Sequence, residues 1–134
     1  MSKVVKFGGS SLADAKQFRK VADIIHADPE RKYVVPSAPG KRFKEDTKVT
    51  DMLYRCYDEV AVQGKDFTEA FAPIRERYNG IISDLGLTLN LDEEFAQIGE
   101  NFKAAVGSDY AASRGEYLNG IVLANYLGFE FIDA

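Results

Sequence analysis

The spacing of apolar residues along this chain predicts five helices separated by turns. In the clearest case, Phe18, Val21, Ala22 and Ile25 recur at the helical spacing i, i+3, i+4 and i+7, which places them on one face. Glycine, proline and capping residues then set the helix ends. The predicted helices run from the capping turn Ser11–Asp14 to Asp28, from Thr50 to Gly64, from Phe67 to Leu85, from Asp92 to Gly107, and from Ser108 to Gly128. In the fourth of these helices Val106 is predicted to face inward.

Three short apolar runs predict strands. Val4–Phe7 and Tyr33–Val35 bracket the first helix, and Phe129–Ile132 follows the last. Strand, helix and strand with such short connections form a βαβ unit, so the first two strands should be parallel neighbours with a right-handed crossover. The first run is almost continuously apolar, which is typical of an interior strand covered on both faces. Leu87–Leu91 alternates with polar residues, which suits either a short strand or an extended connector.

Composition narrows the class of protein. The chain has 134 residues, 46% apolar and 28% charged, as expected for one globular domain with a core. The net charge of −4 argues against nucleic acid as a partner. The single cysteine, Cys56, lies on the apolar stripe of the second helix and is predicted to be buried, and the single histidine excludes a histidine-rich metal cluster. With neither a secretory signal nor a membrane-length apolar run, we expect a cytoplasmic protein without a membrane partner.

The first chemically distinctive segment follows the first strand. Gly8 and Gly9 interrupt the apolar run, two serines follow, and Lys6 precedes the turn by two residues. A strand, a glycine turn and a helix N-terminus bring backbone N–H groups toward an anion. Glycine permits close backbone approach and the positive φ angles that such turns often need. The alternative is an ordinary strand-to-helix turn in which Ser11 caps the helix.

A second loop is predicted at the same edge of the sheet. Pro36–Gly40, which contains Ser37, follows the second strand. Ligands gather at the carboxyl ends of parallel strands, so this loop and the glycine turn should lie together. The following residues 41–48 are charged and lack periodicity. They predict a solvated, mobile loop, and a basic lid over a phosphate site is the alternative.

Four segments together resemble aspartate kinases, within the amino acid kinase superfamily. In chain order they are Lys6-Phe7-Gly8-Gly9-Ser10-Ser11, Val34-Val35-Pro36-Ser37-Ala38, Val49-Thr50-Asp51-Met52-Leu53 and Ser113-Arg114-Gly115-Glu116-Tyr117-Leu118. The resemblance implies an α/β, three-layer α/β/α amino acid kinase-like (carbamate kinase-like) fold with a mainly parallel sheet. It also implies that residues 1–134 are the N-terminal part of the catalytic domain, without the nucleotide-binding half or regulatory domains.

The resemblance further implies a reaction, in which ATP, with Mg, phosphorylates the side-chain carboxylate of L-aspartate. This is the first step of lysine, threonine and methionine biosynthesis from aspartate. By position in the motifs, Lys6 would be catalytic and would bind phosphate together with Gly8, Gly9 and Ser10. Ser37, Thr50 and Glu116 would bind aspartate, and no metal ligand is assigned. The resemblance also implies a homo-oligomer, and we expect the 134 residues alone to be inactive.

Several alternatives stay open at this point. The link between Ser37 and Thr50 is longer than usual for aspartate kinases, so Thr47 competes with Thr50 for the place beside the substrate. Arg114 stands where related sequences vary and is not expected to be catalytic. Another amino acid kinase, acting on glutamate or acetylglutamate, is the alternative enzyme. A non-catalytic module that associates with itself through the edge at Phe129–Ile132 is the alternative of another class.

Overall fold

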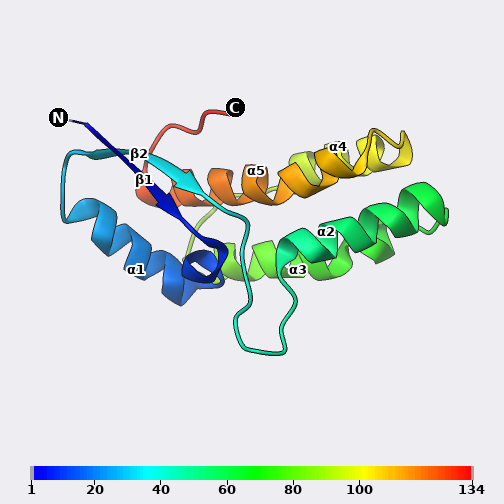
Figure 1. Ribbon diagram of the computed structural model, residues 1–134, viewed down its shortest axis with the longest axis horizontal. Coiled ribbons are helices and arrows are strands. Elements are labelled where there is room, and N and C mark those ends of the chain that lie inside the picture. Colours follow the sequence, from blue (N-terminus) through cyan, green and yellow to red (C-terminus); the bar gives the residue numbers. More distant parts are fainter. Residues whose placement is uncertain (1, 134) are drawn as a thin grey trace.

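The computed structural model describes residues 2–133 as helices packed beside a small parallel sheet (Figure 1). Strands β1 and β2 pair in parallel and α1 connects them, which confirms the predicted βαβ unit. The helices also match the prediction in number and order. The elements are β1 (Lys3–Phe7), the 3₁₀ turn η1 (Gly9–Leu12), α1 (Ala15–His26), β2 (Arg31–Pro36), α2 (Val49–Tyr57), the π-helical turn η2 (Asp58–Val62), α3 (Phe67–Asp84), α4 (Asp92–Lys103) and α5 (Ser108–Leu127).

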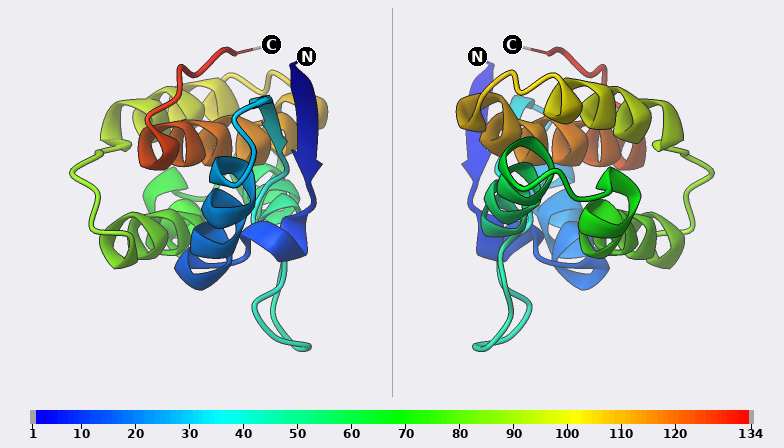
Figure 2. Two further views of the ribbon diagram at one scale, coloured as in Figure 1. Left: turned by 90° about the vertical axis from the view of Figure 1, so that its left-hand side faces the viewer. Right: turned by 90° about the vertical axis from the view of Figure 1, so that its right-hand side faces the viewer.

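The sheet has one packed face and one open face. Successive strand residues alternate between the faces, and Val5 pairs with Val34 on the face that packs against the core. On the other face Val4, Tyr33 and Val35 are 68%, 57% and 47% exposed. The helices lie on one side of the strand pair (left view of Figure 2). The prediction that β1 is covered on both faces is therefore wrong for the part of the chain that the structure describes.

The core lies among the helices, where aromatic rings from α2, α3, α4 and α5 meet. Phe67 stacks on Phe71 with ring centroids 4.8 Å apart, and Phe71 contacts Phe95 edge to face at 5.2 Å. Phe102 of α4 contacts both Phe67, at 5.8 Å, and Tyr57, at 5.2 Å. Such contacts add to the free energy of apolar burial. This cluster fixes the helices that carry the later motif segments.

Two helix ends differ from the prediction. Asp14, rather than Ser11, caps α1, because its carboxylate accepts a hydrogen bond of 3.0 Å from the Gln17 N–H. The fourth helix ends at Lys103, four residues before the predicted Gly107. Beyond it Ala105 takes a left-handed φ of 56°, and Val106, predicted to face inward, is 51% exposed. The apolar spacing therefore extends beyond the last helical residue, and for this reason it predicted the end of the helix too late.

The predicted third strand, Phe129–Ile132, is absent among the described residues. The segment follows α5 without strand pairing, and the ring of Phe131 packs over Gly120 and edge to face against Tyr117, with centroids 5.6 Å apart. These contacts hold the segment on α5 instead of on β2. Leu87–Leu91 is likewise an irregular connector, which was one of its two predicted forms. No helix within residues 2–133 is long and apolar enough to cross a membrane.

Cys56 is 1% exposed, which confirms its predicted burial and gives a pH-dependent expectation. Burial, with a smaller contribution from the charge of Glu59, raises the pKa of the thiol to about 12 from an ordinary value of 9.0. Above pH 9 the unfolded chain loses this proton and the folded chain keeps it, so the free energy of unfolding should fall as the pH rises. Urea titrations at pH 8 and pH 10 should show this loss, and Cys56→Ala should reduce it. An equal loss in both chains would contradict the assignment.

Candidate functional site

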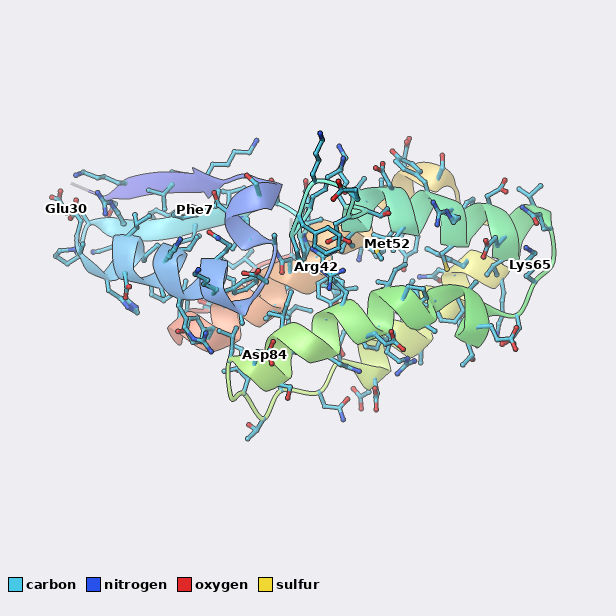
Figure 3. All side chains as sticks on the ribbon, turned by 90° about the horizontal axis from the view of Figure 1, so that it is seen from below. Phe7, Glu30, Arg42, Met52, Lys65 and Asp84 are labelled. Carbon is cyan, nitrogen blue, oxygen red and sulfur yellow. The ribbon has the colours of Figure 1, made fainter. Side chains whose placement is uncertain are left out.

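The two loops at the carboxyl ends of β1 and β2 are in direct contact, as predicted. Ser37 N–H extends the strand pairing by donating to the Phe7 carbonyl at 3.0 Å, and Gly40 N–H donates to the Gly9 carbonyl at 2.8 Å. Phe7 therefore marks the point where β1 leads into this contact (Figure 3). The glycine turn and the loop that contains Ser37 form one continuous edge of the molecule.

Close approach explains two of the three glycines here. A Cβ atom on Gly9 would lie 3.0 Å from the Ala38 carbonyl oxygen, and one on Gly40 would lie 2.6 Å from the Gly9 carbonyl carbon and 2.8 Å from Ser10 N. Gly8 and Gly9 do not adopt positive φ angles, contrary to one reason given for them from the sequence. Gly8 has a φ of −75°, and a Cβ there would meet no protein atom within 4 Å. Close contact between backbones therefore explains Gly9 and Gly40, and open space, not a positive φ angle, distinguishes Gly8.

The helix N-terminus expected behind the glycine turn is not available to an anion. The short turn η1 separates the glycines from α1, and the carboxylate of Asp14 occupies the start of that helix. Any anion at the turn would depend on backbone amides and on Lys6. Lys6 lies on the open face of β1, opposite Val35, and its side chain makes no hydrogen bond or ion pair with the residues that the structure describes.

Helices α2 and α5 bring the other two motif segments to this edge. Val49 N–H donates to the Pro39 carbonyl at 3.0 Å, so α2, with Thr50 as its second residue, starts against the loop. A Cβ on Gly115 would lie 2.7 Å from the Cβ of Ala38, so the backbone of α5 passes very close to the loop at Gly115. Tyr78 of α3 holds this crossing, because its buried hydroxyl donates to the Gly115 carbonyl at 2.8 Å.

Asn119 of α5 also holds the loop, and the sequence analysis missed it. The residue is fully buried, and its amide Nδ2 donates to the Ser37 carbonyl at 2.7 Å. Its Oδ1 has no partner among the residues described. The sequence signal was an amide next to Leu118 on the apolar face of a helix, where an unpaired polar group would be costly.

Of the candidate residues, only Glu116 lines the cavity beside β2 and α5. This cavity of about 620 Å³ lies between β2, α5 and residues 129–133. Lys6, Ser37 and Thr50 are not part of its wall as described. Thr47 and Thr50 are both half-buried, one just before α2 and the other in its first turn. The predicted residues therefore share one edge but are not enclosed in one cavity.

Arg114, in the same cavity wall, is held by aromatic rings. Its guanidinium lies 4.7 Å from the ring centroid of Tyr110 and 4.4 Å from that of Tyr117, and it donates to the Ser113 hydroxyl at 3.0 and 3.1 Å. These contacts fix the side chain through its neighbours on α5. Packing and hydrogen bonding alone therefore explain how the Arg114 side chain is held.

An ion pair within the charged segment folds the predicted loop back on itself. The Arg42 guanidinium donates two hydrogen bonds of 2.6 and 2.9 Å to the Asp46 carboxylate, and the Arg42 backbone N–H donates a third of 3.0 Å. The Asp46 side chain is only 7% exposed. The hydrogen bond from Arg42 holds the pKa of this carboxyl well below its usual range. Residues 41–45 are exposed as predicted, but the loop closes on a buried carboxylate.

Comparison with known proteins places the fold and the motifs in one family. The family model described as "Amino acid kinase family" matches residues 1–132. The chain therefore belongs to the amino acid kinase family. Its α/β organisation with a parallel sheet agrees with the fold of its structural neighbours, so the predicted fold class is confirmed.

Particular relatives are aspartate kinases. An aspartate kinase from Clostridium acetobutylicum is 51% identical, with a TM-score of 0.92, over 98% of this chain and 30% of its own. Aspartokinase 3 of Bacillus subtilis is 38% identical over 98% of this chain and 30% of its length. Escherichia coli aspartokinase III, solved with aspartate and ADP, shares the fold at 24% identity and a TM-score of 0.72. The chain thus spans about 30% of the length of the first two relatives.

Proposed function

We propose that this chain is part of an aspartate kinase catalytic domain, the part that holds L-aspartate and the phosphoryl group in transfer. The observation that carries the proposal is the direct contact between the glycine turn and the loop containing Ser37, with Lys6, which pairs with none of residues 2–133, beside it. The 51% identity to the Clostridium acetobutylicum enzyme supports aspartate as the substrate. The reaction would transfer the ATP γ-phosphoryl group to the side-chain carboxylate.

Lys6 and the glycine turn would stabilise the charge on the phosphoryl group. A carboxylate is already a nucleophile, so positioning and electrostatic stabilisation provide most of the catalysis in such a transfer. Lys6 is exposed at the end of β1, where its ammonium can approach the phosphoryl oxygens. The amides of Gly8, Gly9 and Ser10 would contribute hydrogen bonds, and the open space at Gly8 leaves room for close approach.

Glu116 and the loop hydroxyls would hold the amino acid. Glu116 is exposed on α5, lines the cavity, and forms no ion pair with the residues described, so its carboxylate is available to the α-ammonium of aspartate. Ser37 and either Thr50 or Thr47 would hydrogen-bond the substrate. The Ser37 backbone is fixed on both sides, by the Phe7 carbonyl and by Asn119.

The nucleotide would be held only in part by this chain. Lys6 and residues 8–10 suit the phosphates, and no other described residues are assigned to ATP. No group of three or more His, Cys, Asp or Glu side chains that could hold a metal ion is found within residues 2–133. Mg bound to ATP would neutralise phosphate charge. We propose that the 134 residues alone do not catalyse the transfer, because they span about 30% of the relatives' length.

A chimera tests the proposal. Residues 1–134 replace the matching segment of the Clostridium acetobutylicum aspartate kinase, and the acyl phosphate formed from Mg-ATP and L-aspartate is trapped with hydroxylamine. We expect activity with aspartate and none with glutamate, and no activity from the 134-residue chain alone. A folded chimera, shown by circular dichroism and a cooperative melt, that is inactive or prefers glutamate would overturn the assignment.

A further inference from the structure

Arg77 of α3 is a charged residue buried beneath the site loops. Its side chain is 2% exposed, although the residue stands in a helix pattern that the sequence analysis treated as ordinary. Burial lowers the pKa of the guanidinium, and the nearby charge of Arg42 lowers it further. A charged group in such a place is retained only where its hydrogen bonds compensate for lost hydration.

Those hydrogen bonds go to three separate stretches of backbone. Nη2 donates to the Ala13 carbonyl, just after the glycine turn, at 2.9 Å, and also to the Gly40 carbonyl. Nη1 donates to the Thr47 carbonyl, just before α2, at 3.2 Å. One planar group thus links the end of the turn after β1, the loop after β2 and the approach to α2.

The charge of Arg77 is balanced from the same loop. Asp46 Oδ2 lies 3.8 Å from Arg77 Nη1 and also accepts a hydrogen bond from Arg42 Nε. Figure 3 shows Arg42 between the part of the molecule that contains β1 and α1 and the part that contains α2 and α3. Both arginines therefore contact the same carboxylate, and Oδ2 of Asp46 lies between the two guanidinium groups.

We propose that Arg77 is a positioning residue that sets the distance between the phosphate-binding turn and the loop that carries Ser37 and Thr47 and leads into Thr50 of α2. The guanidinium reaches all three carbonyls because its donors are fixed in a plane, and a lysine ammonium has no such fork. Arg77 is buried beneath the loops, so its proposed action is through their backbone and not through contact with substrate. Its effect on catalysis rests on the proposed function, while its effect on the loops does not.

Hydrogen–deuterium exchange on the 134-residue chain tests the effect on the loops. Arg77→Lys should raise exchange about tenfold or more in residues 8–13 and 37–48, with α4 unchanged. Arg75→Met is the matched control, because Arg75 lies on the same helix and pairs at the surface with Asp92 and the Phe95 ring. It should leave both loops protected. Asp46→Asn, which empties no space in the core, should loosen residues 41–48 and leave residues 8–13 protected.

Kinetics in the chimera test the effect on catalysis. A displaced loop should raise KM for aspartate about tenfold or more in Arg77→Lys, whereas simple loss of folded enzyme would lower kcat and leave KM unchanged. Exchange that rises equally in all helices, or that is unchanged in both loops, would overturn the proposal. An inactive unmutated chimera would count against the proposed function alone, because the exchange experiment decides the role of Arg77 without substrate.

Discussion

Replacing Lys6 with methionine should lower kcat of the chimera by about 10²–10³-fold, the loss typical when one preorganised donor to a transition-state charge is removed. Methionine is close to lysine's four-carbon stem in length and lacks the ammonium. Lys6 forms no hydrogen bond or ion pair with the residues described and lies on the open face of β1, so stability should be unchanged. Hydroxamate formation measures the rate, and thermal melts measure the fold.

Lys20→Met is the matched control for this prediction. Lys20 is an exposed lysine on α1, away from the loop edge, and the same substitution there should leave both kcat and the melting temperature unchanged. Equal activity of Lys6→Met and Lys20→Met would remove Lys6 from the mechanism. A loss in both chimeras would point to general surface charge as the cause.

Replacing Gly40 with alanine should destabilise the chain by about 1–3 kcal/mol, as overpacking at a tight contact does. The new Cβ would lie 2.6 Å from the Gly9 carbonyl carbon and 2.9 Å from its oxygen. These are backbone atoms, so no side-chain rotation can relieve the clash and the two loops must separate. Urea titration followed by circular dichroism measures the change, and binding of L-aspartate should weaken with it.

Gly80→Ala provides the control within the same chain. Gly80 lies inside α3, and a Cβ there would meet nothing within 4 Å. Alanine is the better helix former, so this substitution should stabilise the chain by about 0.5–1 kcal/mol. Opposite signs at positions 40 and 80 are expected. A neutral result at Gly40 would mean that the glycine turn and the Ser37 loop are not in contact in solution.

Local pattern was enough to predict the helices and the βαβ unit. Apolar spacing placed Phe18 and Ile25 on one face of a helix, and short connections made the first two strands parallel neighbours. The parallel pairing also predicted that Ser37 and the glycine turn lie at one edge, since the carboxyl ends of parallel strands meet there. Periodicity could not show that the segment at Phe131 stays on α5, because strand pairing depends on contacts remote in sequence.

What the sequence by itself determined were the helices, the βαβ unit, their order and the motif segments of the amino acid kinase family, because apolar period, turn residues and motif identity are local properties. Only the tertiary structure decided why Gly9 and Gly40 are glycines and which groups hold the loops. Arg77 and Asn119 act through carbonyls 30 or more residues away, so nothing in their neighbouring sequence records their partners. Their roles follow from burial, because buried polar groups are stabilised by hydrogen bonds, here from the Arg77 Nη atoms and Asn119 Nδ2 to loop carbonyls.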